Sequence, residues 1–485
     1  MHAEVAAAAH ERQKLERLCR YIALHGCRVL RRLGTIASAP DRYSRIAAVT
    51  NLPGLGTLLA QDVVPRRYQQ GSDKLCLATL SFVWRLQLYS RLMCYIGIYF
   101  IAMNILLVLT KGGLGGTQSC VLDLARWLTS HGHFVTVGFG VGSFLRDALI
   151  DEGIQTVQFK SLHRTINPFK NLLFIRELQK HVDLYDTDVV HFNNPNSVFG
   201  GIGAKWSRTK PAIVYTVHGL SMLDPQYEMH PLVRRAYYGL FRFLFKWIDA
   251  VVFVSQHNME IANKTQLFKQ GYVVYNGVDI DALGILSRRE AREHMISRIP
   301  EDERSKSAFL IGSIGRLAYA KNYEFIINVF PLILEKNPNA QLVVIGEGGE
   351  RQLYELLIKK LRLESVVHLV GEMEFAARYV RAFDLFVLPS RYEGMSITVL
   401  ETISAGIPVL VSNVAGNEEI VGGDDRQLHV LNDESDFLSK IEPLMHNETL
   451  REQVCRYNQE RGELFHISKT GEGYVKLYQQ LVSEK

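Results

Sequence analysis

Cysteine is scarce in this chain of 485 residues, and its six cysteines follow no regular spacing. Because none lies in a Cys-x2-Cys pair, the sequence indicates neither a zinc site nor a disulfide framework. A reducing cytosol is the setting that we expect for such a chain. The cysteines are Cys19, Cys27, Cys76, Cys94, Cys120 and Cys455.

A strong excess of one charge is also missing from most of the chain. The net charge is +5, but residues 1–102 hold 14 Lys and Arg against 6 Asp and Glu, whereas residues 103–485 hold 41 against 44. The near-neutral part gives no electrostatic reason to expect nucleic-acid binding. Hydrophobic residues at 47% and charged residues at 22% are typical of a globular protein, and the length predicts two or three domains.

No apolar run in the sequence is long enough for a clear membrane span. Residues 92–109 approach the ~18 residues that a span needs, but their second half is required as a core strand. Leu92–Ala102 alone is too short to cross. The N-terminus also lacks the charged, apolar and small-residue pattern of a secretory signal.

Residues 1–102 differ in character from the rest of the chain. An Ala- and Arg-rich start is followed by pieces broken by Gly and Pro, and residues 4–22, EVAAAAHERQKLERLCRYI, resemble a fragment of an insertion-sequence transposase. We interpret residues 1–102 as an appended extension. The alternative is an N-terminal accessory or membrane-anchoring segment.

From Met103 onward, apolar strand-like runs alternate with stretches of helical periodicity. This alternation predicts an α/β protein of parallel sheets covered by helices on both faces. The number of strands exceeds one sheet and the pattern restarts near residue 309, so we expect a domain at 103–280, a second at 281–470 and a helix at 471–485 that packs across the junction. The predicted strands are 104–109, 134–139, 188–192, 212–217, 250–254, 271–275, 309–314, 341–345, 366–370, 385–388 and 408–412.

A glycine-rich turn, KGGLGGTQ at residues 111–118, follows the first predicted strand. Gly115 and Gly116 would let backbone amides approach a phosphate, at the start of a helix whose N-terminal N–H groups are free. The turn has neither the G-x-G-x-x-G spacing nor a Walker ending, and a bare structural turn is the alternative.

Two later segments carry charged side chains at the ends of predicted strands. GSIGRLAYAKN, residues 312–322, holds Arg316 and Lys321, which could bind a diphosphate, although a solvated basic loop is the alternative. SRYEGMSITVLETISAGIPVLVS, residues 390–412, places Glu393 in a loop and Glu401 eight residues later in a helix. The first glutamate could reach sugar hydroxyls and the second a ribose.

These two segments, with VIGEGGERQ at residues 344–352 between them, resemble family 4 of the GT-B glycosyltransferases. The resemblance runs from about Met103 to Gln480, and TVHG at 216–219 and VVYNGVD at 273–279 are also similar. It implies two Rossmann-like domains facing a cleft, the first for the acceptor and the second for the nucleotide sugar. Thr402 and Asn417 depart slightly from the family pattern.

The resemblance also implies a role for each site residue. Arg316 and Lys321 would neutralise the leaving nucleoside diphosphate, and Glu393 and His218 would contact the transferred sugar. Glu401 would bind the ribose. Backbone groups of Gly115, Gly116, Met395, Ser396 and Ile397 would approach the diphosphate or, for the glycines, the acceptor. Such enzymes retain the anomeric configuration and need neither a metal nor a cofactor besides the donor.

Two Asp-x-Asp triplets imitate the metal-binding motif of the other main glycosyltransferase fold. Asp186 and Asp188 precede a predicted strand, and Asp279 and Asp281 lie in the linker, so we expect neither to bind metal. The basic and aromatic stretch 230–250 is either a core helix with basic outer residues or a surface that leans on anionic lipid.

We therefore predict a retaining transferase that moves a hexose or N-acetylhexosamine from a nucleoside-diphosphate sugar to a glycan or polyprenol-linked acceptor in bacterial surface polysaccharide synthesis. It would be cytoplasmic, with peripheral contact to the inner membrane as an open extension. The alternatives are a GT-B epimerase or hydrolase, a nucleic-acid-binding protein acting through residues 1–102, and a non-catalytic scaffold. Loops 161–171 and 221–230 are the expected sites of acceptor specificity.

Overall fold

The computed structural model describes residues 102–113, 115–142, 144–164, 167–220, 230–268, 270–301 and 308–485. By its internal contacts the chain divides into Met1–Phe100 and Ile101–Lys485. The transposase-like segment, the proposed anchor and most of loop 221–230 lie outside the described residues.

The first lobe is built on a sheet of seven parallel strands in the order β3-β2-β1-β4-β5-β6-β7. Strands such as β5, in which all six residues are buried, are apolar throughout because helices cover both sheet faces. β1 pairs with both β2 and β4, so the strand order reverses there, the usual place for a ligand in such sheets. The strands are β1 (Asn104–Lys111), β2 (Phe134–Val141), β3 (Gln155–Gln158), β4 (Val189–Phe192), β5 (Ala212–Val217), β6 (Ala250–Phe253) and β7 (Gly271–Val273).

Alternate residues of β1 pack into two different cores. Ile105, Leu107 and Leu109 face one cluster, which also contains residues of α5 and α18, whereas Leu106 and Val108 face another, which contains residues of α7, α8 and α9. This is the period of two that a strand imposes on its side chains. The helices of this lobe are α5 (Gly116–Ser130), α6 (Phe144–Asp151), α7 (Pro168–Leu184), α8 (Gly200–Trp206), α9 (Pro231–Leu244) and α10 (Gln256–Asn263).

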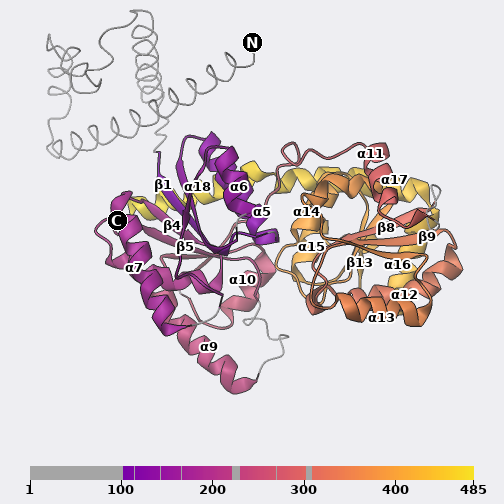
Figure 1. The fold of residues 1–485 in the computed structure, drawn as a ribbon, viewed down its shortest axis with the longest axis horizontal. Helices are drawn as coiled ribbons and strands as arrows, with labels where there is room; N and C mark the ends of the chain where they lie inside the picture. Colours follow the sequence, from indigo (N-terminus) through magenta and orange to yellow (C-terminus); the bar gives the residue numbers. More distant parts are fainter. Residues whose placement is uncertain are drawn as a thin grey trace, which may run out of the picture. The chain divides into compact units, whose positions relative to one another are not determined.

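The second lobe repeats this plan with six parallel strands in the order β10-β9-β8-β11-β12-β13 (Figure 1). Its strands are β8 (Phe309–Ile314), β9 (Ala340–Ile345), β10 (Val367–Gly371), β11 (Leu385–Leu388), β12 (Val409–Ser412) and β13 (Leu428–His429). Its helices are α11 (Arg288–Ser297), α12 (Tyr323–Lys336), α13 (Arg351–Leu361), α14 (Ile397–Ser404), α15 (Ala415–Val421), α16 (Glu434–His446) and α17 (Glu448–Gly462). Two parallel-sheet lobes confirm the predicted fold class.

The last helix, α18 (Ile467–Ser483), returns from the second lobe to the first (Figure 1). Tyr478 donates or accepts a 2.6 Å hydrogen bond with His191 of β4, and the other ring nitrogen of His191 lies 2.7 Å from Thr216 of β5. Thr216 in turn bonds Tyr474 at 2.8 Å. This buried network makes His191 a structural residue, and α18 begins four residues before the helical tail expected from Gly471.

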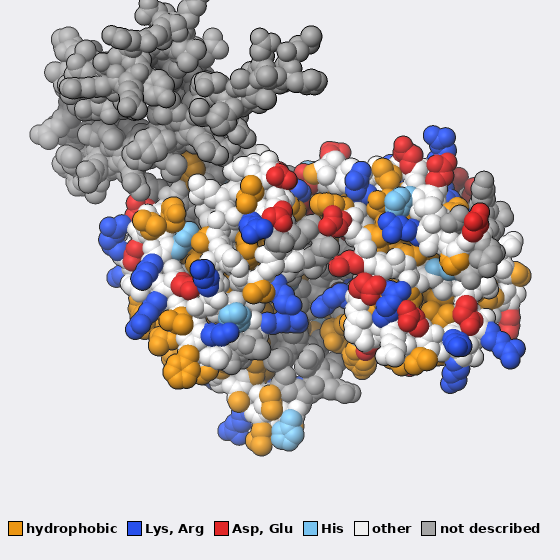
Figure 2. Space-filling model, viewed as in Figure 1, with side chains coloured by type: hydrophobic (Ala, Val, Ile, Leu, Met, Phe, Trp, Pro, Cys, Tyr) orange, Lys and Arg blue, Asp and Glu red, His pale blue; other side chains and the backbone are white. Residues whose placement is uncertain are grey.

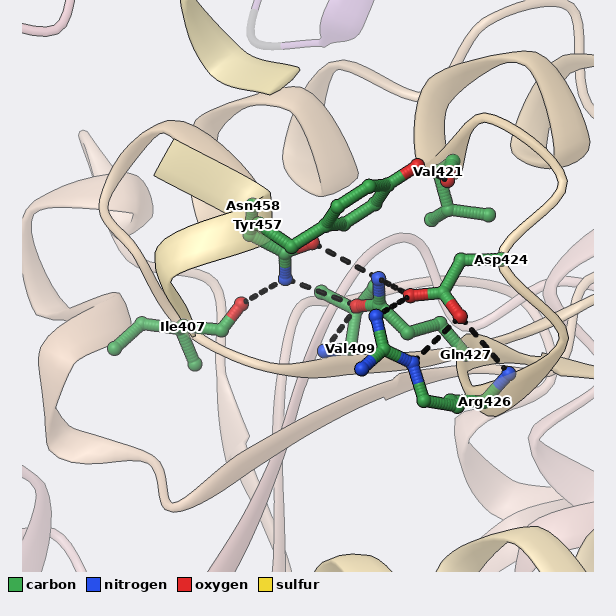
Figure 3. A network of polar contacts seen from close by, with 8 residues as sticks. All are labelled: Ile407, Val409, Val421, Asp424, Arg426, Gln427, Tyr457 and Asn458. Carbon is green, nitrogen blue, oxygen red and sulfur yellow. Dashed lines mark hydrogen bonds and ion pairs between the residues drawn. The ribbon is translucent and has the colours of Figure 1, made fainter. Parts of the chain in front are cut away.

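A second buried polar network joins α17 to the sheet of the second lobe (Figure 3). The Asn458 amide donates to the Ile407 carbonyl at 2.8 Å and to Gln427 Oε1 at 2.9 Å. Gln427 donates to Asp424 at 3.1 Å, and Asp424 also binds Arg426. Because Asn458 and Gln427 are fully buried, their amides depend on one another for hydrogen bonds.

All eleven strands predicted from the sequence are present in the described part of the chain; three have the predicted bounds, and the ends of the others differ by one or two residues. Two further strands were missed. β3 is a polar, partly exposed edge strand of sequence QTVQ, and β13 has only two residues. Neither carries the apolar run on which the prediction depended.

Helix α9 is less buried than the core-helix interpretation of residues 230–250 expects. Only Phe241 and Leu244 are buried along it, whereas Leu232 and Val233 are 71% and 55% exposed. The first two turns therefore project from the lobe. Across the described part of the chain, no helix combines the length and apolar character needed to cross a bilayer.

Candidate active site

Lys321 and Glu393 meet at the carboxyl edge of the second sheet. Lys321 ends a short turn, Tyr319–Lys321, that follows β8, and Glu393 lies in the loop after β11. Since β8 and β11 are neighbouring parallel strands, these two segments emerge side by side. Lys321 Nζ donates to Glu393 Oε1 at 2.6 Å, and the two side chains are only 20% and 12% exposed.

Glu393 also accepts a hydrogen bond from the Ser390 hydroxyl at 2.7 Å, on the same carboxylate oxygen that binds Lys321. Its position is therefore set from two sides before any ligand arrives. The sequence predicted that Lys321 and Arg316 bind a diphosphate and did not foresee a partner for the lysine. The structure pairs Lys321 with Glu393, so a diphosphate would have to share or exchange this partner.

Arg316 differs from Lys321 in its surroundings. It follows β8 and is exposed, and it has no ion-pair partner among the described residues. The neighbouring Gly315 lies against the Lys321 stem, since a Cβ placed on that glycine would lie 3.3 Å from Lys321 Cε. The exposed guanidinium of Arg316 therefore remains available to an anion.

The start of α14 provides backbone donors beside Glu393. Ser396 is the N-cap residue, but its side chain caps no backbone amide and instead lies 3.2 Å from the Thr398 hydroxyl. The first-turn N–H groups of a helix favour negative charge. Met395, Ser396 and Ile397 are themselves buried.

The glycine-rich turn of the first lobe faces this helix start. A Cβ on Gly116 would lie 3.6 Å from Ile397 Cγ1, so the two helix N-termini of α5 and α14 adjoin across the lobes. Gly115 and Gly116 are exposed, and α5 also has no side-chain cap. The glycine-rich turn and the start of α14, which were both predicted to approach a phosphate, thus open toward the same region.

His218 follows β5 and lies against the loop after β11, next to Glu393. A Cβ on Gly394 would come within 2.0 Å of the His218 carbonyl oxygen, so only glycine fits between Glu393 and Met395 here. The imidazole contacts Asn193 Oδ1 at 3.1 Å through Nε2, and its Nδ1 is buried with no partner among the described residues. Burial lowers the pKa of His218 to about 4, so the ring is neutral at pH 7.

Glu401 lies deeper, where α14 packs on α5. It is 8% exposed, and burial together with the nearby Asp123 carboxylate raises the pKa of Glu401 to about 8. Burial also raises the pKa of Asp123 to about 7. At neutral pH Glu401 is therefore mostly protonated, and Asp123 of the other lobe is partly protonated.

Two family models match the chain, one on each lobe. The family described as Glycosyltransferase Family 4 matches residues 114–282, and the family described as Glycosyl transferases group 1 matches residues 296–461. Since both models describe glycosyltransferases and together they span both lobes, the chain is a glycosyltransferase.

Several characterised relatives share most of its length. The glycosyltransferase is 26% identical over 347 residues to the UDP-Gal:alpha-D-GlcNAc-diphosphoundecaprenol alpha-1,3-galactosyltransferase of Escherichia coli, covering 69% of this chain and 86% of that protein. It is 23% identical over 344 residues to the N,N'-diacetylbacillosaminyl-diphospho-undecaprenol alpha-1,3-N-acetylgalactosaminyltransferase of Campylobacter jejuni, covering 69% and 88%.

Solved structures agree on the fold. Anabaena HepE in complex with UDP and glucose superposes with a TM-score of 0.64 at 18% identity, over 78% of this chain and 99% of that one. Sucrose-phosphate synthase from Thermosynechococcus elongatus gives 0.66 at 18% identity, over 79% and 100%. The predicted GT-B fold is confirmed.

Contacts between the lobes of the glycosyltransferase include residues that sequence reasoning missed. The Glu419 carboxylate accepts the backbone N–H groups of Gln256 and His257, at 2.9 and 2.8 Å. Asn258 donates to the Gly394 carbonyl at 3.0 Å. These residues follow β6 or lie in α15, and their position at the carboxyl edge of a strand was the one signal that could have found them.

Aspartates of the two Asp-x-Asp triplets form hydrogen bonds or an ion pair with other groups of the first lobe and the linker. Asp188 accepts the Asn104 backbone N–H at 2.8 Å, Asp186 pairs with Arg208, and Asp279 closes a turn by accepting the Ala282 N–H at 3.0 Å. Within the described ranges, no group of three His, Cys, Asp or Glu side chains is arranged to hold a metal ion.

Proposed function

We propose that this glycosyltransferase retains the anomeric configuration and transfers a hexose or N-acetylhexosamine from a nucleoside-diphosphate sugar to a polyprenol-diphosphate-linked or glycan acceptor, in bacterial surface polysaccharide synthesis. The observation that carries the proposal is the Lys321–Glu393 pair beside His218 and the two uncapped helix starts. This group of residues combines hydrogen-bond donors for a departing diphosphate with a carboxylate that can accept hydrogen bonds from sugar hydroxyls.

The chemistry follows from where charge develops. As the glycosidic bond breaks, negative charge grows on the diphosphate, and Lys321, Arg316 and the first-turn amides of α14 would stabilise it. His218, neutral at pH 7, can donate or accept a hydrogen bond near the sugar without adding charge. A phosphate oxygen of the donor would accept the proton of the acceptor hydroxyl, so no protein nucleophile is needed.

The acceptor class is supported by the relatives. The enzymes of Escherichia coli and Campylobacter jejuni both form α-1,3 linkages on sugars carried by diphosphoundecaprenol. We extend this acceptor class, but not the individual sugars, to the present chain.

Helix α9 supports peripheral contact with a membrane that carries such an acceptor. Leu232 and Val233 are exposed beside Arg235, and residues 230–247 contain no Asp or Glu. Figure 2 shows hydrophobic and basic side chains, without acidic ones, at the projecting tip of this helix. A mixed apolar and basic face is typical of helices that lie in a lipid interface.

A donor screen tests the proposed function. Nucleoside diphosphate release from UDP-, GDP- and ADP-sugars would be followed with and without bacterial lipid extract, and again with EDTA. The proposed transferase should release diphosphate only with acceptor and, because it is expected to need no metal, should retain activity in EDTA. Release without acceptor would indicate a hydrolase, and interconversion of sugars an epimerase. NMR of the product linkage would distinguish retention from inversion.

The membrane contact and the role of the N-terminal extension need separate tests. Leu232→Ser/Val233→Ser should reduce sedimentation with vesicles containing anionic lipid, whereas Leu353→Ser, an exposed leucine of the second lobe, should not. Removing residues 1–102 should leave sugar transfer intact. Loss of DNA binding but not of transfer in that variant would show that any nucleic-acid function belongs to the extension.

A further inference from the structure

Two polar side chains outside the predicted site join the turn that carries Lys321 to the loop that carries Glu393. We call residues 319–322 the lysine turn and residues 389–393 the glutamate loop. We propose that Asn322 and Arg391 are positioning residues, which hold Lys321 and Glu393 in register before the donor binds. This inference rests on the proposed function and concerns the same site.

Asn322 connects three segments through one amide. Its Nδ2 donates to the Pro389 carbonyl at 3.0 Å, at the start of the glutamate loop, and to Asn432 Oδ1 at 2.9 Å. The residue is 1% exposed. Pro389 lies four residues before Glu393, so this bond fixes where the glutamate loop leaves β11.

The backbone of Asn322 explains why the turn needs a special residue. Its φ of 57° and ψ of 34° are left-handed, and it ends the lysine turn at the N-cap position of α12, where its side chain forms no cap hydrogen bond. Glycine adopts this conformation freely and asparagine tolerates it, whereas other side chains are strained there. Glycine, however, could not supply the amide that reaches Pro389.

Arg391 holds the same two segments from the other side. Its backbone N–H donates to the Ala320 carbonyl at 2.8 Å, and Nη1 donates to the Tyr319 carbonyl at 2.6 Å. The guanidinium also lies 4.0 Å from the centre of the Tyr319 ring. Lys321 is therefore held from both sides: Arg391 binds the two residues before it, and Asn322, the residue after it, binds Pro389.

The contacts of Asn322 and Arg391 matter because a lysine side chain has four rotatable bonds and loses much conformational entropy when it is held in place. Two fixed segments set the 2.6 Å contact between Nζ and Glu393 in advance. When negative charge develops on the diphosphate, the lysine then needs no reorganisation to meet it. Loss of these contacts should lower kcat more than it changes the donor KM, because it affects the stability of the transition state more than donor binding.

Asn322→Gly is the sharpest test, since it keeps the left-handed backbone and removes only the amide. We expect kcat to fall by about tenfold or more with a smaller change in donor KM, because misplacement of a charged group costs this much. Asn322→Asp, which replaces the donor by an acceptor, should behave alike. Arg391→Lys, which keeps the charge but loses the planar fork, provides a second variant if Asn322→Gly does not fold.

Asn328→Ala is the matched control, because Asn328 lies in α12 and donates only to the Glu324 carbonyl at its surface. The inference is wrong if Asn322→Gly and Arg391→Lys retain wild-type kcat, or if kcat and KM change in them as they do in Asn328→Ala. Failure of the proposed function would look different: the wild-type chain itself would release no diphosphate from any donor.

Discussion

At the scale of single residues, the candidate site is a set of opposite charges held at short range. Lys321 and Glu393 neutralise each other, Arg316 remains exposed, and His218 is kept neutral by burial. Before a donor binds, the net positive charge of these side chains therefore comes from Arg316.

The first prediction concerns the paired side chains. Lys321→Ala and Glu393→Ala should each lower turnover by ~100-fold or more, as the loss of one transition-state contact commonly does. The measurement is steady-state kinetics with the donor identified by the screen. Lys336→Ala is the control, because Lys336 forms a surface ion pair with Glu442 in the same lobe. Near-normal turnover in both site variants would remove these residues from the active site.

The second prediction concerns the buried carboxyl of Glu401. Its pKa is about 8 in the folded protein and 4.5 ordinarily, so between these values the unfolded chain releases a proton that the folded chain keeps. Folding stability therefore falls as pH rises from about 4.5 to 8. Glu401→Gln cannot titrate, so its stability relative to wild type should rise over this range.

Urea unfolding at pH 5 and pH 8 measures the effect. The exposed Glu472→Gln on α18 should show no comparable pH-dependent gain. A difference between Glu401→Gln and wild type that stays constant with pH would contradict the assigned burial of this carboxyl group.

At the scale of elements, α17 is held to the second sheet by a polar network rather than by apolar packing alone (Figure 3). Asn458→Ala would leave the Ile407 carbonyl without this donor and remove one partner of Gln427. We expect the free energy of unfolding to fall by about 1–3 kcal/mol, the cost of an unsatisfied buried polar group. Gln453→Ala, at an exposed position of α17, should change stability little. Equal stability of the two variants would show that the network adds nothing.

The elements themselves were largely predictable, for a physical reason that also explains the failures. Buried central strands such as β1 and β5 must be apolar on both faces, so an apolar run in the sequence predicts them. The edge strand β3 is half solvated and needs no such pattern. Helix α9 has hydrophobic residues that suggest a core helix, but its first two turns have no neighbour in the described part of the chain to bury them.

At the scale of the whole molecule, Glu419 joins the second lobe to the first turn of α10. That turn carries the positive end of the helix dipole, so a carboxylate there is favourable. Glu419→Ala should weaken the contact by about 0.5–2 kcal/mol, the usual cost of losing a helix cap. Hydrogen exchange at the amides of Gln256 and His257 measures it, and the exchange should accelerate. The adjacent, exposed Glu418→Ala is the control, and unchanged protection in Glu419→Ala would exclude the contact in solution.

The sequence alone predicted the two-sheet plan, the family resemblance and the candidate site residues, because buried strands and ligand-binding turns both require particular residue types in order along the chain. It could not determine which side chains touch. Three sets of contacts join residues that are far apart in the chain. Lys321 pairs with Glu393, Glu401 is buried beside Asp123, and Asn322 and Arg391 connect the lysine turn to the glutamate loop. The packing of parallel strands, which brings their carboxyl ends to one edge, decides the contacts of Lys321, Asn322 and Arg391, and the packing of α14 on α5 decides that of Glu401.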